Sequence, residues 1–336
     1  NAGQANACTG NQGWVDTVES AESIAAALNI SAEEVLITST GVIGQPIKMD
    51  KLKAGIPSLV SGLSADGSEA AAKAIITTDL VTKSIAMETT IHDRPVRIGG
   101  ISKGSGMIHP NMATMLAFVT CDSTVSPTLW QDMLRRAADR SFNQITVDGD
   151  TSTNDTLIAL ANGESRTPAI MDEGPEAEQL EAMLTEVCKH LAKAIARDGE
   201  GATCLIEVTV SGAVNAQAAH QVARTIAGSS LVKSAIFGHD PNWGRIAAAA
   251  GRSATVFDQN DLRIQLGDIV LMEHGQPLCF DRPAASAYLK TATQGEYLKT
   301  DTVAIQVRIG DGPATGQAWG CDLSYDYVKI NAEYTT

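Results

Sequence analysis

The stretch MIHPNMATMLAFV, residues 107–119, follows the Gly-rich run GGISKGSGM and enters an apolar run through the single hydroxyl of Thr114. A Gly-rich approach is typical of a turn, and a short apolar run is typical of a buried strand. Taken alone, a Thr before such a run is nearly always a helix cap or the start of a strand. Its hydroxyl becomes chemically important if the chain is cut before Thr114. An N-terminal Thr carries both a nucleophile and an α-amine that can take its proton, and such an amine has a pKa of about 8.

Composition restricts the classes of protein to which the chain can belong. Its 336 residues, 44% hydrophobic and 19% charged, are ordinary for a globular protein of one large or two smaller domains. The formal net charge of −14 repels a phosphate backbone and argues against a nucleic-acid partner. No window approaches the roughly 20 apolar residues of a membrane helix. The chain begins with Asn rather than Met, so we expect a further N-terminal segment in the whole protein.

The six cysteines are scattered, without C-x-x-C pairs and without His at metal-ligand spacing. This pattern predicts reduced cysteines in a cytoplasmic protein that has no metal site.

Hydrophobic periodicity predicts an α/β protein in which helices cover β-sheets. Helices are expected at residues 15–28, 50–63, 67–76, 126–138, 176–197 and 215–228. Strands are expected at 35–38 and 204–212, hairpins at 82–102 and 263–278, and further hairpin material at 302–312. The polar loops between these elements carry the candidate motifs.

Two motifs suggest other chemistry. Residues 100–104, GISKG, match the nucleophile elbow of α/β-hydrolases around Ser102, but no helix is expected directly after them. The same run fails as a P-loop, because Gly104 rather than Ser or Thr follows Lys103. The run VDGDTSTND places Asp148 and Asp150 after an apolar strand, as a Mg²⁺-dependent phosphotransferase would. A calcium loop is excluded there, because its sixth position is Thr153 and its twelfth is Ala159.

A third motif is the loop GHDPNWGRI at residues 238–246, which holds a His, an Asp and an Arg. We favour a packed turn before a helix for it.

The run KGSGMIHPNMATML, residues 103–116, closely resembles the self-cleavage site of the ornithine acetyltransferase family (the ArgJ family, glutamate N-acetyltransferases of arginine biosynthesis). In that family the precursor is cut before the Thr of Ala-Thr-Met-Leu. Further segments resemble the family in the same order and span nearly the whole chain. They are ANACTG at 5–10, STGVIG at 39–44, TTD at 77–79, DGDTSTND at 148–155, DGEGAT at 198–203, GHDPNWGRI at 238–246 and YVKINAEYTT at 327–336.

The resemblance implies a cut between Ala113 and Thr114, giving an α chain of residues 1–113 and a β chain of residues 114–336. It implies Thr114 as the nucleophile in both self-cleavage and acetyl transfer, and Thr40 with Gly41 as the oxyanion hole. The substrate-binding positions that it implies are Thr77, Lys103, Thr114, Glu200, Asn331 and Thr336. It also implies an ArgJ/DmpA-like layered fold of two chains, an α₂β₂ heterotetramer, and no metal or organic cofactor.

The implied reaction transfers an acetyl group from N²-acetylornithine to glutamate through an acetyl-Thr enzyme, and acetyl-CoA is a candidate second donor. The residue types suit these substrates. Lys103, Asn331 and Thr336 can meet an α-carboxylate, and Glu200 can meet the ornithine ammonium. Two alternatives stay open at this point: a self-cleaving aminopeptidase of the same fold, and a Mg²⁺-dependent phosphotransferase centred on Asp148.

Overall fold

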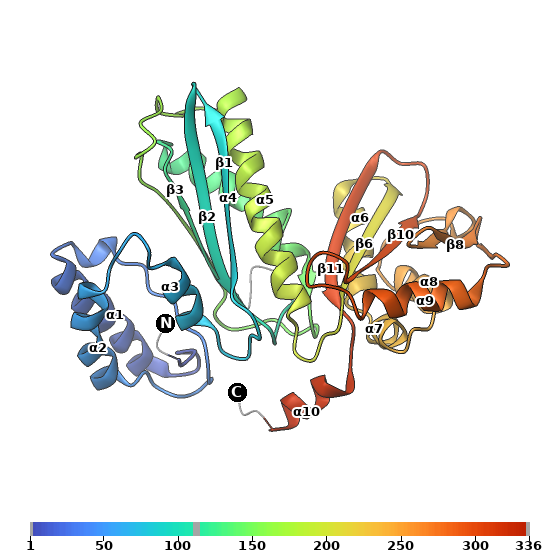
Figure 1. Ribbon diagram of the computed structural model, residues 1–336, viewed down its shortest axis with the longest axis horizontal. Coiled ribbons are helices and arrows are strands. Elements are labelled where there is room, and N and C mark those ends of the chain that lie inside the picture. The colour runs from blue at the N-terminus through green and yellow to red at the C-terminus, as the bar shows by residue number, and fades with distance from the viewer. Residues whose placement is uncertain (1–2, 110–114, 334–336) are drawn as a thin grey trace.

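The computed structural model describes residues 3–109 and 115–333, which form two β-sheets surrounded by helices (Figure 1). The predicted mixed α/β class is confirmed. The α-helices are α1 (Gly10–Leu28), α2 (Met49–Ser61), α3 (Ser68–Ile75), α4 (Pro127–Asp139), α5 (Pro175–Arg197), α6 (Ala216–Ala227), α7 (Ser230–Phe237), α8 (Trp243–Gly251), α9 (Arg282–Ala292) and α10 (Tyr325–Glu333). Short 3₁₀ helices lie at Ala32–Glu34, Phe142–Gln144 and Gln259–Asp261.

The strands are β1 (Lys83–Ile91), β2 (Arg94–Lys103), β3 (Leu116–Cys121), β4 (Ile145–Thr146), β5 (Thr156–Ala161), β6 (Leu205–Ala213), β7 (Arg263–Leu266), β8 (Ile269–Glu273), β9 (Gln276–Pro277), β10 (Thr302–Arg308) and β11 (Ala314–Cys321). They divide into one sheet of four strands and one of seven.

The first sheet has the order β1-β2-β3-β5 and contains the predicted hairpin of residues 82–102. Its turn is at His92 and Asp93, whose φ angles of 50° and 58° are those that a type I′ hairpin turn requires. One face of this sheet packs against α4 and α5 (Figure 1). The α5 stripe predicted from the sequence forms the core of this layer. Its members Leu180, Leu184, Val187, Leu191 and Ile195 are all fully buried.

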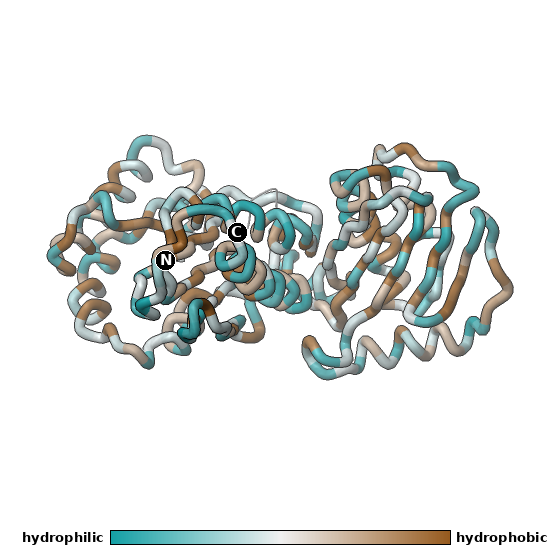
Figure 2. The backbone as a smooth tube through the Cα atoms, turned by 90° about the horizontal axis from the view of Figure 1, so that it is seen from above, coloured by the Kyte–Doolittle hydropathy of each residue, from teal (hydrophilic) through white to brown (hydrophobic). Residues whose placement is uncertain are grey.

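The second sheet has the order β4-β11-β6-β10-β7-β8-β9, and the alternation of hydrophobic and hydrophilic residues along its strands is visible in Figure 2. The hairpin predicted at residues 263–278 is confirmed as β7 and β8 with the short β9. The expectation that residues 302–312 begin a hairpin is wrong. Strand β6 lies between β10 and β11, parallel to β10 and antiparallel to β11. Strand β6, about a hundred residues earlier in the chain, therefore separates β10 from β11 and pairs with both. The local sequence pattern does not reveal such a partner.

Helices α1, α2 and α3 form a separate layer beside the first sheet (Figure 1). The strand predicted at residues 35–38 is also wrong, since this segment is extended but pairs with no strand among the described residues. Its side chains are correspondingly open, and Leu36 is 64% exposed. The next few residues bond instead to the N-terminal segment, through a bridge between Gln4 and Val42 and a bond from the Gly44 N–H to the Ala7 carbonyl.

Helix α10 leaves β11 and runs beneath the joint between the two sheets (Figure 1). It is tied to the loop after α5, because the Ser324 hydroxyl donates to the Gly201 carbonyl at 2.7 Å. Gly201 has φ +73°, and a Cβ there would lie 2.6 Å from the Tyr327 nitrogen, so this close approach needs glycine. None of the described helices is both long and apolar enough to cross a membrane.

Candidate active site

A cavity of about 180 Å³ opens where the ends of the first sheet, the turn after residue 39, the loop after α5 and helix α10 meet. Six of the residues implied by the resemblance line it, although they come from segments far apart in the sequence. The full lining is Thr40, Gly41, Ile43, Thr77, Thr78, Lys103, Gly106, Met107, Asp148, Asp150, Ser152, Asn154, Glu200, Tyr327 and Asn331. The fold therefore brings together every predicted site residue that lies within the described part of the chain.

The turn at Thr40 and Gly41 is fixed by the N-terminal segment and by the loop before β5. The Ser39 hydroxyl donates to the Gln4 carbonyl at 2.6 Å, and the Asn154 side-chain amide donates to the Ser39 carbonyl. Gly41 has φ +136°, and a Cβ there would stand 2.4 Å from the Gly3 carbonyl oxygen. A side chain at this position would clash with the N-terminal segment, so the close approach of the Thr40–Gly41 turn to that segment needs glycine.

The cationic group of the cavity is Lys103, at the end of β2. Its ammonium donates to the Thr77 hydroxyl at 2.9 Å and lies 3.8 Å from the Asp79 carboxylate. Burial lowers the pKa of Lys103, and the nearby Asp79 opposes this change. An ammonium beside a hydroxyl in a partly closed cavity is suited to a carboxylate ligand.

Glu200, from the loop after α5, is one of the acidic residues that line the cavity, and it is 8% exposed. Its carboxylate accepts from the Asn331 side-chain amide at 2.8 Å, and its backbone N–H donates to the Ser105 carbonyl at 3.0 Å. A Cβ on Gly106 would stand 2.6 Å from the Glu200 carboxyl carbon, so Gly106 makes the space in which this side chain lies. The cavity thus presents a carboxylate and an ammonium from different walls.

Asp148 acts in the structure as a backbone clamp. Its carboxylate accepts from the backbone N–H groups of Met107 at 2.6 Å, Ile108 at 3.0 Å and Asp150 at 3.2 Å. These bonds hold the segment that leads toward the proposed cut. They occupy three of the acceptor sites of the carboxylate and leave it less available to a magnesium ion or a phosphoryl group, and among the described residues no cluster of three or more His, Cys, Asp or Glu could hold a metal.

The elbow match at Ser102 has no elbow geometry. Ser102 lies inside strand β2 with its side chain fully buried. The loop of residues 238–246 packs against α9, beside the second sheet, where His239 contacts Thr293 at 2.9 Å and Asp240 pairs with Arg282 at 2.6 Å. None of its residues lines the cavity, and the turn leads into α8, as the packed-turn interpretation predicts.

Several residues that line the cavity are not among the site residues predicted from the sequence, and two of them are Asn154 and Tyr327. Burial raises the pKa of Tyr327 to about 12, and Asp148 and Glu200 add to the effect. Asn154 lies in DGDTSTND and Tyr327 begins YVKINAEYTT, so both belong to segments that carried the resemblance. Membership of those segments was the signal that could have identified them.

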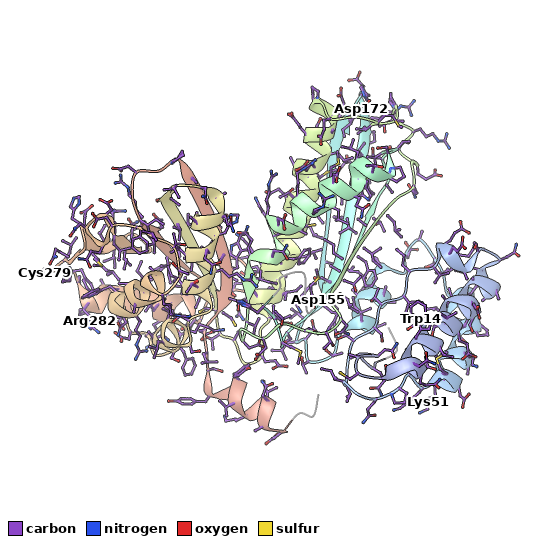
Figure 3. The ribbon with its side chains drawn as sticks, turned by 180° about the vertical axis from the view of Figure 1, so that it is seen from behind. Trp14, Lys51, Asp155, Asp172, Cys279 and Arg282 are labelled. Atoms are coloured by element: carbon purple, nitrogen blue, oxygen red, sulfur yellow. The ribbon has the colours of Figure 1, made fainter. Side chains whose placement is uncertain are left out.

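Ala113, Thr114 and Thr336 lie outside the described residues. Met115, which follows Thr114 in the chain, is described, and its carbonyl accepts from Thr156 at 2.8 Å. The neighbouring Asp155 lies near the lower end of the first sheet (Figure 3), and within residues 3–109 and 115–333 no group makes a well-formed hydrogen bond with its carboxylate oxygens. Burial raises the pKa of Asp155 to about 8, which the nearby Met115 backbone and Lys103 offset only in part.

Comparison with known proteins gives consistent results over the whole chain. The ArgJ family model matches residues 1–336. A relative from Nostoc, named arginine biosynthesis bifunctional protein ArgJ 1, is 74% identical over the full chain and 81% of its own length. A chloroplastic protein of the same name from Ricinus communis is 59% identical over the full chain and 71% of its own length. The crystal structure of arginine biosynthesis bifunctional protein ArgJ from Bacillus halodurans aligns with a TM-score of 0.62 and 47% identity. The alignment covers 66% of this chain and 100% of that one.

Proposed function

The chain belongs to the ArgJ family, and from that premise we propose that it is a glutamate N-acetyltransferase that transfers acetyl from N²-acetylornithine to glutamate in arginine biosynthesis. The observation that carries the proposal is the convergence of Thr40, Gly41, Thr77, Lys103, Glu200 and Asn331 on one cavity. The names of the relatives support the pathway, and the word bifunctional in them agrees with a second activity, for which we propose acetyl-CoA as the donor.

In the proposed mechanism Thr114 is the nucleophile. Its α-amine takes the hydroxyl proton while the oxygen attacks the acetyl carbonyl, and the Thr40 hydroxyl with the Gly41 backbone N–H stabilises the oxyanion. The amine of ornithine takes up that proton and leaves. The amine of glutamate then attacks the acetyl-Thr ester and gives a proton to the α-amine, which passes it to the Thr114 oxygen as the acyl C–O bond breaks and the free hydroxyl is restored. Each half-reaction uses the same donors, because both pass through the same kind of tetrahedral oxyanion.

The charges of the cavity assign the ends of the substrates. We assign the α-carboxylate of either substrate to Lys103 and Thr77, with Thr336 as a further donor. We assign the ornithine ammonium to Glu200. Asn331 already donates to Glu200 at 2.8 Å, so its role in this proposal is to orient that carboxylate for the ammonium.

The proposal includes self-cleavage between Ala113 and Thr114, giving chains 1–113 and 114–336 in an α₂β₂ heterotetramer. One comparison supports it. The aligned Bacillus halodurans chain is covered completely yet corresponds to 66% of this chain, and residues 114–336 make up about two thirds of it as well. A cytoplasmic location is also proposed, because the six cysteines are free thiols, as in a reducing compartment.

The test is the intact mass of the denatured wild type beside Thr114→Ala, with Thr120→Ala, whose side chain is exposed near the end of β3, as a matched control. We expect two fragments from the wild type and from Thr120→Ala, and one uncut chain from Thr114→Ala. Transfer of labelled acetyl from acetylornithine to glutamate should follow the same pattern. An uncut wild type that still transfers acetyl would refute the N-terminal nucleophile. Hydrolysis that glutamate does not suppress would favour the aminopeptidase.

A further inference from the structure

Three buried charged side chains that the proposed mechanism does not use, Lys83, Asp79 and Asp198, continue inward from Lys103 as one chain. Lys83 is fully buried, and its ammonium lies 2.7 Å from the Asp79 carboxylate and 2.6 Å from the Asp198 carboxylate. Asp79 in turn faces Lys103 at 3.8 Å. Two ammonium groups and two carboxylates thus alternate from the protein interior to the cavity wall, and their formal charges cancel.

Asp79 is the hub of this chain. Its side chain is fully buried, and its carboxylate accepts from the backbone N–H of Gly104 at 2.7 Å and of Thr77 at 3.1 Å. It therefore fixes both neighbours of the carboxylate-binding subsite, the Thr77 hydroxyl and the turn that follows Lys103. Burial alone would raise the pKa of Asp79, but Lys83, Lys103 and the Gly104 N–H together hold it below its usual value. The group is a permanent anion at working pH.

Asp198 connects the same chain to the opposite wall. Its carboxylate accepts from the Leu80 N–H at 3.0 Å, and its backbone carbonyl accepts from the Ser105 hydroxyl at 2.7 Å. Ser105 in turn accepts the Glu200 N–H, so one bonded unit supports both proposed ends of the substrate.

Lys103 is the member of this chain whose burial favours loss of its proton. Four titratable groups face it: Asp79, Glu200 and Asp155 favour its charged form, while Lys83 opposes it. Of these, Asp79 is the carboxylate in ion-pair contact. An ammonium buried without a nearby anion loses its proton at lower pH, because a low-dielectric environment penalises the charged form.

We propose that Asp79 is the positioning residue for carboxylate recognition: it keeps Lys103 charged and directed into the cavity, while the Lys83–Asp198 pair holds Asp79 in place. Asp79 does not touch the substrate in this scheme. It acts through Lys103, and its loss should narrow the pH range in which a carboxylate substrate binds. The inference rests on the proposed function, since it takes the ligand of Lys103 to be an amino-acid carboxylate.

The test is calorimetric binding of glutamate to the purified protein between pH 6 and 10, followed by kcat/KM for acetylornithine over the same range. In Asp79→Asn the alkaline loss of affinity should move to lower pH by about 1–3 units, as the loss of an opposite charge at contact distance predicts. Asp79→Glu should restore the wild-type position. Asp198→Asn is the matched control, because it removes an equal charge from Lys83 without touching Lys103. Its alkaline limit should move by less than half as much.

Lys103→Arg gives a second reading that does not depend on the folding of Asp79→Asn. Arg keeps its charge throughout this range, so the alkaline limit should move upward. An unmoved limit in Lys103→Arg, or equal shifts in Asp79→Asn and Asp198→Asn, would overturn the inference. A wild type that binds glutamate with the predicted variant shifts, yet transfers no acetyl, would support the inference and refute the proposed function. A wild type that does not bind glutamate would overturn both.

Discussion

Replacing Lys83 by Met should strongly destabilise the fold. The Lys83 side chain is fully buried, as is that of Asp79, and the Asp198 side chain is only 4% exposed. Met fills a similar volume but leaves two buried carboxylates without their shared cation. Breaking a buried ion pair by removing one partner costs about 3–5 kcal/mol, most of it from the uncompensated charge that remains.

The matched control is Lys53→Met, since Lys53 pairs with Glu19 at 2.5 Å while both side chains remain about 40% exposed. Exposed pairs of this kind contribute little to stability, because water and salt screen them, so this variant should unfold close to the wild-type midpoint. The assay is urea unfolding of both variants at pH 5 and pH 7, followed by tryptophan fluorescence and circular dichroism. Lowering the pH should reduce the cost of Lys83→Met, because unpaired buried carboxylates take up protons more readily than paired ones.

A cost below about 1 kcal/mol for Lys83→Met, or a cost that does not change between pH 5 and pH 7, would refute this reasoning. The first result would mean that the two carboxylates find other partners. The second would mean that they are not the groups left charged.

Three further outcomes follow from the cavity and its surroundings. Glu200→Gln should lower kcat/KM for acetylornithine about 100-fold, equivalent to about 3 kcal/mol, while the reaction of acetyl-enzyme with glutamate changes little. Equal losses in both half-reactions would contradict recognition of the ornithine ammonium by Glu200. Gly106→Ala places a methyl group 2.6 Å from the Glu200 carboxyl carbon, so it should lower stability by about 1–3 kcal/mol and also weaken binding of the acetyl donor. Gly55→Ala, where the added methyl group meets open space, should leave stability and donor binding intact. Thermal unfolding and steady-state kinetics compare the two variants, and equal behaviour would contradict the packing argument. The folded state raises the pKa of Asp155 from 3.8 to about 8, so it binds this proton more tightly than the unfolded chain, and wild-type stability falls as the pH rises through that window. The stability of Asp155→Asn relative to wild type should therefore increase by a few kcal/mol between pH 5 and pH 8, whereas that of Asp172→Asn, at the far end of the sheet (Figure 3), should not. A difference between Asp155→Asn and wild type that is the same at both pH values would contradict this reasoning.

Local patterns predicted those elements whose residues alone set their shape. The α5 stripe from Leu180 to Ile195 could be predicted because a helix repeats its buried face every three to four residues. The turn at His92 and Asp93 could be predicted because two strands separated by two residues are joined by only a few turn types. Residues 35–38 show the limit of this reasoning. Their apolar, β-branched composition predicted a strand, but a strand needs a partner, and pairing is a property of the whole fold.

The candidate site divides in the same way. The sequence by itself determined which residues carry chemistry, because KGSGMIHPNMATML and the segments that resemble the family stand in a fixed order along the chain. Only the tertiary structure decided that Thr40, Lys103, Glu200 and Asn331 share one cavity, and that Lys83 supports it from below. Charges more than a hundred residues apart leave no local signal. Their interaction depends on distance and on burial, and both are set only when the sheets, the loop after α5 and helix α10 pack together.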